Sequence, residues 1–153
     1  MTLLVDTSVW SLALRRDTIA NEPEVDALKA ALAGSDVVVT TGLVLQELLQ
    51  GFAGPKARTQ IIESFAALPL IQPDRADHIA AADLRNTCRK AGVQMATVDA
   101  LIAQLCISHD ITLLSTDKRL CSCRRALCAE ALGQQNETAT HMSSNFSTII
   151  STK

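Results

Sequence analysis

The sequence has few aromatic residues and no long apolar run. Among 153 residues there is no tyrosine, one tryptophan and three phenylalanines, so few rings are available for stacking the bases of a single-stranded nucleic acid. No segment reaches the roughly 18–20 consecutive apolar residues that a membrane-spanning helix needs. Residues 1–6 also lack the basic region and the apolar core of a signal peptide. We therefore expect a cytoplasmic protein.

The chain has no overall basic character, since 14 lysines and arginines stand against 16 aspartates and glutamates. The charge is unevenly distributed: residues 1–117 contain 14 acids and 9 bases, and residues 118–153 contain 2 acids and 5 bases. The hydrophobic share of 48% is enough for a packed core and excludes a long disordered chain. The five cysteines are expected to be free thiols, because the cytoplasm is reducing.

Short apolar runs alternate with longer helical patterns along the chain. The runs at residues 3–5, 37–39 and 111–114 are typical of strands buried on both faces of a parallel sheet. Helical periodicity covers residues 8–15, 23–32, 42–50, 56–68, 74–91 and 98–108. This alternation predicts an α/β fold with a doubly wound, mainly parallel sheet.

Two acidic residues follow predicted strands. Asp6 ends the first strand, and Asp117 lies three residues beyond Leu114 at the end of the third. Ligands of open parallel sheets bind beyond the carboxyl ends of the strands, so both acids are expected at one cleft. Considered singly, each is more simply explained as a turn or N-cap aspartate.

Two further acids lie within apolar helices. Glu47 has apolar neighbours at i−4, i−3 and i+1, and no lysine or arginine occurs between Lys29 and Lys56. The alternative is that Glu47 lies on the polar edge of its helix. Asp99 lies in the first turn of an almost wholly apolar helix, where Thr97 is the expected N-cap and the helix dipole favours an acid.

These four carboxylates together predict a site for a divalent cation. Without a cation they would repel one another, and oxygen ligands favour Mg²⁺ or Mn²⁺. Such an ion polarises a phosphate and activates water for attack on it. It also reverses the local sign of the field, so an acidic protein can bind a polyanion.

Four segments resemble the motifs of a known family. Residues 4–10 (LVDTSVW) resemble the opening of a PIN domain, specifically that of the VapC-type toxin ribonucleases of bacterial toxin–antitoxin modules. Residues 45–51, 98–103 and 113–118 are similar to the second, third and fourth motifs of the family. The order and spacing agree over residues 2–120, and all four motifs in order are specific although each alone is weak.

The resemblance implies a three-layer α/β/α sandwich and a Mg²⁺- or Mn²⁺-dependent endoribonuclease that cleaves RNA with a metal-activated water. It implies that the metal is held by a catalytic quartet, with two hydroxyl residues beside it. The quartet is Asp6, Glu47, Asp99 and Asp117, and the hydroxyl residues are Ser8 and Thr116. It also implies a homodimer and a cognate antitoxin.

The sequence departs from the family after Leu120. The nuclease domain is therefore expected at residues 1–120, and residues 121–133 form an atypical remnant of the final strand region. Residues 134–153, of which twelve are Ser, Thr, Asn or Gln, are expected to form a flexible tail.

The candidate RNA contacts are Arg15, Lys118 and Arg119, of which the last two adjoin the fourth acid. Two other functions compete with the nuclease. The first is a catalytically silent PIN-like module that binds an antitoxin or RNA. The second is a phosphoaspartate protein, which is disfavoured because Ser8 occupies the place of the second acid in a D-x-D motif and because the adjacent acid pair of receiver domains is absent.

Overall fold

The computed structural model describes residues 1–15, 22–117, 120 and 149–150. Along the chain the elements are β1 (Thr2–Val5), α1 (Thr7–Leu14), α2 (Pro23–Ala33), β2 (Val37–Thr41), α3 (Gly42–Gly51), α4 (Pro55–Ala66), β3 (Leu70–Ile71), α5 (Arg75–Lys90), α6 (Thr97–Ser108), β4 (Thr112–Leu114) and β5 (Ile149–Ile150). The strand order in the sheet is β3-β2-β1-β4-β5. The predicted α/β class is confirmed.

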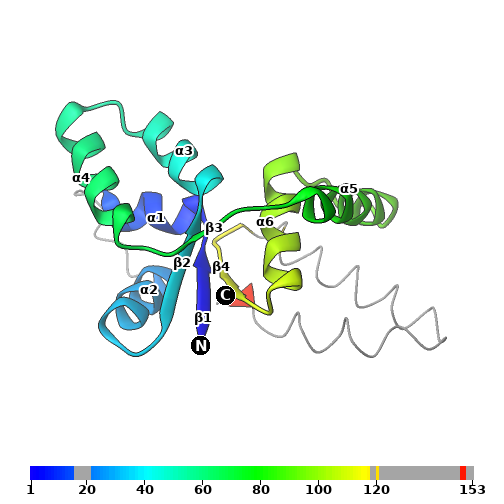
Figure 1. Cartoon of the computed structure of the whole chain (residues 1–153), viewed down its shortest axis with the longest axis horizontal. Coiled ribbons are helices and arrows are strands. Elements are labelled where there is room, and N and C mark those ends of the chain that lie inside the picture. Colours follow the sequence, from blue (N-terminus) through cyan, green and yellow to red (C-terminus); the bar gives the residue numbers. More distant parts are fainter. Residues whose placement is uncertain (16–21, 118–119, 121–148, 151–153) are drawn as a thin grey trace. The chain divides into compact units, whose positions relative to one another are not determined.

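The sheet is parallel where β1, β2 and β3 pair. Thr2 is opposite Val37 in the β1–β2 register, and Thr40 is opposite Leu70 between β2 and β3. Figure 1 shows β1 and β2 side by side. The runs predicted as strands are short and rich in β-branched or leucine residues, and apart from the exposed Val37 the predicted residues of β1 and β2 are buried, as expected for a parallel sheet.

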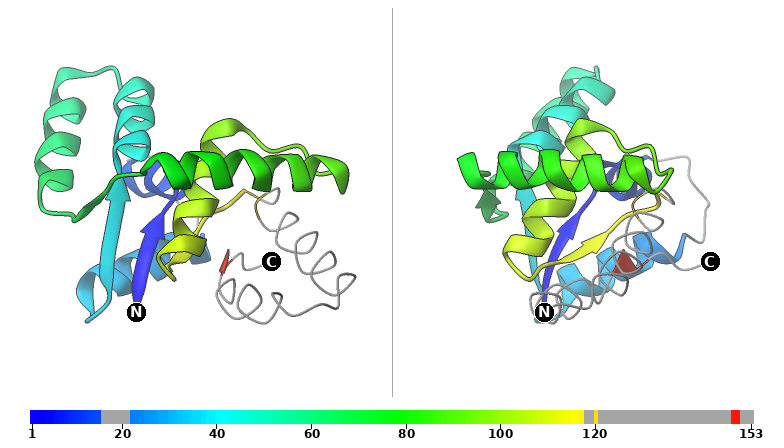
Figure 2. Two further views of the ribbon diagram at one scale, coloured as in Figure 1. Left: turned by 45° about the vertical axis from the view of Figure 1, so that its right-hand side comes forward. Right: turned by 90° about the vertical axis from the view of Figure 1, so that its right-hand side faces the viewer.

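The chain divides into two compact units. The first unit comprises Met1–Gln72 and Leu114–Thr116, and the second comprises Pro73–Leu113 and the described residues from Asp117 onward. In the first unit, α1 packs against α2 and α3. Figure 2 shows α3 and α4 running alongside each other.

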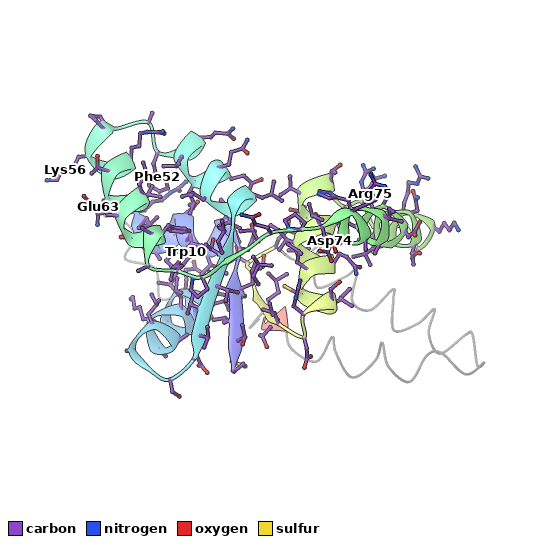
Figure 3. All side chains as sticks on the ribbon, in the orientation of Figure 1. Trp10, Phe52, Lys56, Glu63, Asp74 and Arg75 are labelled. Carbon is purple, nitrogen blue, oxygen red and sulfur yellow. The ribbon has the colours of Figure 1, made fainter. Side chains whose placement is uncertain are left out.

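Trp10 lies in the core of the first unit. It is 7% exposed, and its ring lies 4.8 Å from that of Phe65, at an interplanar angle of 55°. Figure 3 labels Trp10 beside α1. Tilted aromatic pairs of this kind stabilise a core beyond the area they bury, so this tryptophan is not a base-stacking platform.

The second unit is built on the packing of α5 against α6, which Figure 2 shows crossing each other. Helix α6 is apolar on most of its surface and buries residues 100–103, 105 and 106. Helix α5 begins with a capping box, in which the Asp74 carboxylate accepts a bond from the Asp77 backbone N–H and the Asp77 carboxylate accepts one from the Asp74 backbone N–H.

Several details differ from the sequence-based prediction. Strand β3 was not predicted, and β5 lies inside the segment expected to be a polar tail. The N-cap of α6 is Ala96 and not Thr97, which is the first residue of the helix. Cys88 is disulfide-bonded, contrary to the expectation of free thiols. Residues 121–133 and the remainder of 134–153 lie outside the described residues.

Within the described part of the chain, no helix combines the length and the apolar character required to cross a bilayer.

Candidate functional site

The candidate site of the first unit lies where β1 and β4 end. Asp6 follows β1 directly, and its backbone N–H donates a 2.9 Å hydrogen bond to the carbonyl oxygen of Leu114, the last residue of β4. Ser115 and Thr116 follow immediately. The sheet therefore brings two polar segments together that are more than 100 residues apart in the chain.

The carboxylate of Asp6 is held by two hydroxyl groups. Asp6 is 8% exposed, and its Oδ2 accepts hydrogen bonds from Ser8 Oγ at 2.6 Å and from Ser115 Oγ at 2.8 Å. Ser8 Oγ in turn accepts a 3.2 Å bond from the backbone N–H of Thr116. The bonds from Ser8 and Ser115 both go to Asp6 Oδ2, so they fix the orientation of this carboxylate.

Asp6 caps helix α1 through its backbone and not through its side chain. Asp6 is the N-cap residue of α1, and its carbonyl oxygen accepts bonds from the backbone N–H groups of Val9 and Trp10. Its side chain makes no capping hydrogen bond, although aspartate is favoured at this position because its side chain can do so. The buried carboxylate is therefore not explained by helix capping.

Glu47 lies on α3 and is half-buried. The helix begins after Thr41, whose hydroxyl oxygen accepts a bond from the Val44 N–H as its N-cap. Glu47 Oε2 accepts a 2.6 Å hydrogen bond from the hydroxyl of Thr7, in the first turn of α1. Glu47 thus has a specific partner at the edge of its helix, and this partner is a hydroxyl group and not a cation.

Neither carboxylate is neutralised by a basic side chain. In the described part of the chain, no lysine, arginine or histidine forms an ion pair with Asp6 or Glu47. Burial removes a carboxylate from water at a cost in free energy, and hydroxyl partners do not offset that cost with an opposite charge. Anionic oxygens in this state are the ligands that a hard divalent cation prefers, so the donor set fits Mg²⁺ or Mn²⁺.

The described residues do not contain a ready-made metal cage. Among residues 1–15, 22–117, 120 and 149–150, no group of three or more His, Cys, Asp or Glu side chains is gathered to hold an ion. A full cage is not required for Mg²⁺, which is commonly bound by one or two carboxylates together with water and substrate phosphates.

Asp99 and Asp117 belong to the second unit. Asp99 lies in the first turn of α6, as predicted, and it is half-buried. Asp117 is also half-buried, and its carbonyl oxygen accepts a 3.2 Å bond from the backbone N–H of Leu120. That all four acids share one cation stays a prediction.

Two residues of the site were not identified as partners of the acids from the sequence. Thr7 and Ser115 each donate a hydroxyl bond to a carboxylate. For Ser115, its position in the sequence could have indicated the contact, because Ser115 directly follows β4 just as Asp6 directly follows β1. Thr116, which was predicted as a nearby hydroxyl, contacts Ser8 through its backbone N–H.

The candidate RNA contacts are only partly described. Arg15 is exposed at the C-cap of α1, whereas Lys118 and Arg119 lie outside the described residues. Arg85 of α5 donates from Nε to the Met95 carbonyl oxygen at 2.9 Å. This bond has a structural role in the second unit.

Comparison with known proteins identifies the family. The family model described as the PIN domain matches residues 3–125. A search of curated proteins gives no significant match.

Solved structures share the fold, at low sequence identity. VapBC2 from Rickettsia felis, bound to a DNA fragment from their promoter, has a TM-score of 0.60 and 19% identity, over 76% of this chain and 88% of that chain. FitAcB from Neisseria gonorrhoeae has a TM-score of 0.59 and 20% identity, over 79% and 92%. VapBC-1 from nontypeable Haemophilus influenzae has a TM-score of 0.60 and 17% identity, over 80% and 92%. The fold is therefore the PIN-like three-layer α/β/α class that the sequence predicted.

Proposed function

The chain belongs to the PIN domain family, and on this basis we propose that it is a divalent-metal-dependent endoribonuclease acting as the toxin of a toxin–antitoxin pair. The observation that carries the proposal is the state of Asp6. The residue is 8% exposed, and its carboxylate is oriented by two hydroxyl groups and has no basic partner in the described part of the chain.

A residue in this state is suited to ligating a cation. An aspartate that capped its helix would bond its carboxylate to the first backbone N–H groups, and one in an ion pair would contact a basic side chain. Here the hydroxyls of Ser8 and Ser115 approach one oxygen, Oδ2. In the described residues, no hydrogen bond reaches Oδ1, and this oxygen is the one we assign to the metal.

We assign Mg²⁺ or Mn²⁺ to the quartet Asp6, Glu47, Asp99 and Asp117. The ion would supply positive charge at the scissile phosphate and acidify an attacking water. The chain's own residues hold and orient the ligands: Ser8 and Ser115 fix the Asp6 carboxylate, and Thr116 fixes Ser8 through its backbone N–H. Arg15, Lys118 and Arg119 would contact RNA phosphates by charge, without reading the base sequence.

The partners follow from the same assignment. Two of the similar solved structures are VapBC pairs, which supports a protein antitoxin as the partner of this chain. We further propose a homodimer that works in the cytoplasm, with RNA as substrate.

The test is cleavage of a mixed single-stranded RNA pool by purified full-length protein, with Mn²⁺ or Mg²⁺. Asp6→Asn is expected to lower the cleavage rate by about 100-fold or more, because loss of outer partners of metal ligands alone costs about 10–100-fold. The matched control is Asp83→Asn, which removes one carboxylate from an exposed position on α5. Glu47→Gln has its own control in Glu63→Gln, at an exposed position on α4 labelled in Figure 3.

Two outcomes contradict the proposal. If Asp6→Asn and Glu47→Gln both cleave RNA at the wild-type rate, these acids do not form the site. If folded wild-type protein binds RNA or an antitoxin but cleaves no RNA with either metal, the chain is a silent binding module.

A further inference from the structure

We infer that Thr7 is a positioning residue for Glu47, so that the first turn of α1 sets the placement of two acidic ligands through consecutive hydroxyls. Thr7 holds Glu47 of α3, and Ser8 holds Asp6 at the end of β1. The inference rests on the proposed function, because the placement of the two carboxylates matters for cation binding.

The Thr7–Glu47 bond has the geometry of a strong hydrogen bond. Thr7 Oγ1 lies 2.6 Å from Glu47 Oε2, within the range of about 2.5–2.7 Å for a hydroxyl that donates to a carboxylate. The two residues are 40 positions apart and the bond is partly buried. It therefore links two helices that the sequence separates, and water competes with it less than on an open surface.

The hydroxyl of Thr7 is committed to this tertiary contact. Threonine near a helix start often bonds to the local backbone, but Thr7 donates to the side chain of another helix. Its β-branched side chain has few χ1 rotamers in a helix. Thr7 is thus a stiff donor, and it is the residue next to Asp6.

Glu47 needs such a donor to be held in place. Its flexible side chain lies on a half-buried position of α3, and Gln46 and Gln50 on the same helix are exposed. In the described residues, no basic group pairs with Glu47. Without the Thr7 hydroxyl, the carboxylate is expected to sample rotamers that point into solvent, and its affinity for a shared cation falls.

The test measures Mn²⁺ binding by full-length protein through the loss of the free-ion signal in electron paramagnetic resonance, which does not depend on RNA cleavage. Thr7→Val removes the hydroxyl and keeps the shape, and we expect Mn²⁺ affinity to fall by about 10-fold. Thr7→Ser keeps the hydroxyl and is expected to bind close to wild type. Thr59→Val is the control, because Thr59 lies at an exposed position of α4 and its hydroxyl donates to the Pro55 carbonyl oxygen of the same helix.

A double mutant separates positioning from a general effect on the fold. If Thr7 acts through Glu47, then Thr7→Val added to Glu47→Gln causes no further loss of Mn²⁺ affinity. An additional loss of similar size in the double mutant would overturn the inference. Thr7→Ala is the second hydroxyl-free variant, for the case in which Thr7→Val does not fold.

The two failures are distinguishable. Wild-type affinity in both folded Thr7→Val and Thr7→Ala overturns the role of Thr7 and leaves the proposed function intact. If folded wild-type protein binds no Mn²⁺ at millimolar concentration, the metal-dependent function itself is overturned, and the role of Thr7 with it.

Discussion

Asp6 and Asp74 occupy the same position at the start of two helices, yet their carboxylates bond to different kinds of group. Both are N-cap residues, of α1 and α5 respectively. The Asp74 carboxylate accepts a 2.9 Å bond from the Asp77 backbone N–H and completes a capping box. The Asp6 carboxylate makes no capping bond and accepts two hydroxyl bonds instead. Figure 3 shows Asp74 beside Arg75 at the start of α5.

The difference separates an acid that caps its helix from an acid that is buried and bonded to hydroxyl groups. Asp74 is exposed, and its bonds stabilise a helix terminus, which fully accounts for it. Asp6 is buried and its partners orient it without supplying an opposite charge. Residue type and helical position are the same, so burial and the partners of the carboxylate distinguish the two.

The largest expected effect is stabilisation by a divalent cation. At 100 times its Kd, the ion should stabilise wild-type protein by about 2.7 kcal/mol, which raises Tm by roughly 5–10 °C for a chain of this length. Asp6→Asn should lose this shift, and Asp74→Asn should retain it because asparagine caps helices as well as aspartate. Differential scanning fluorimetry with Mn²⁺ measures the effect. An equal shift in Asp6→Asn would remove the distinction between the two acids.

A smaller effect is expected from Ser115→Ala, because Ser115 is fully buried and donates to the Asp6 carboxylate. Loss of a buried bond to a charged group costs about 1.5–3 kcal/mol of unfolding free energy, measured by urea denaturation without metal. Ser108→Ala is the control, because the Ser108 hydroxyl accepts a hydrogen bond from Gln104 Nε2 at an exposed position. This substitution should change the free energy of unfolding by about 0.5 kcal/mol or less. Equal values for the two variants would show that Ser115 does not support Asp6.

The smallest effect is expected from Asp74→Ala, which removes the cap of α5 and should cost about 1 kcal/mol of unfolding free energy. Asp74→Asn should recover most of that stability. Metal-dependent RNA cleavage should stay near the wild-type rate in both variants, measured well below their Tm. Loss of cleavage in folded Asp74→Ala would mean that Asp74 also serves the functional site.

Sequence periodicity predicted most of the regular structure. The predicted apolar runs correspond to β1, β2 and β4, and the six helices of the described residues lie within a few residues of their predicted bounds. Both follow from apolar stripes or runs, which are a local property of the sequence. Strand β3 was missed because it has two residues and Leu70 is 50% exposed. Two apolar residues are too few to show the pattern of a strand, and in the described structure β3 is defined by its pairing with β2.

The N-cap of α6 shows the limit of local rules. Thr97 is the better capping residue by type, but Ala96 has the extended backbone and Thr97 is already helical. The packing of the apolar helix against α5 involves many side chains and outweighs one capping bond of about 1 kcal/mol. The start of α6 therefore agrees with its packing on α5 and not with the residue type preferred at an N-cap.

The sequence by itself determined the fold class, the order of the helices and of β1, β2 and β4, and the candidate acids, because these depend on apolar patterning and on acids that follow strands or lie in apolar helices. Only the tertiary structure decided which distant residues Asp6 and Glu47 contact. The hydroxyls of Ser115 and Thr7 reach carboxylates 109 and 40 positions away, and the Asp6 carboxylate makes no capping bond to its own helix. Such contacts depend on strand pairing and helix packing between distant segments, and no local pattern encodes the direction of a side chain.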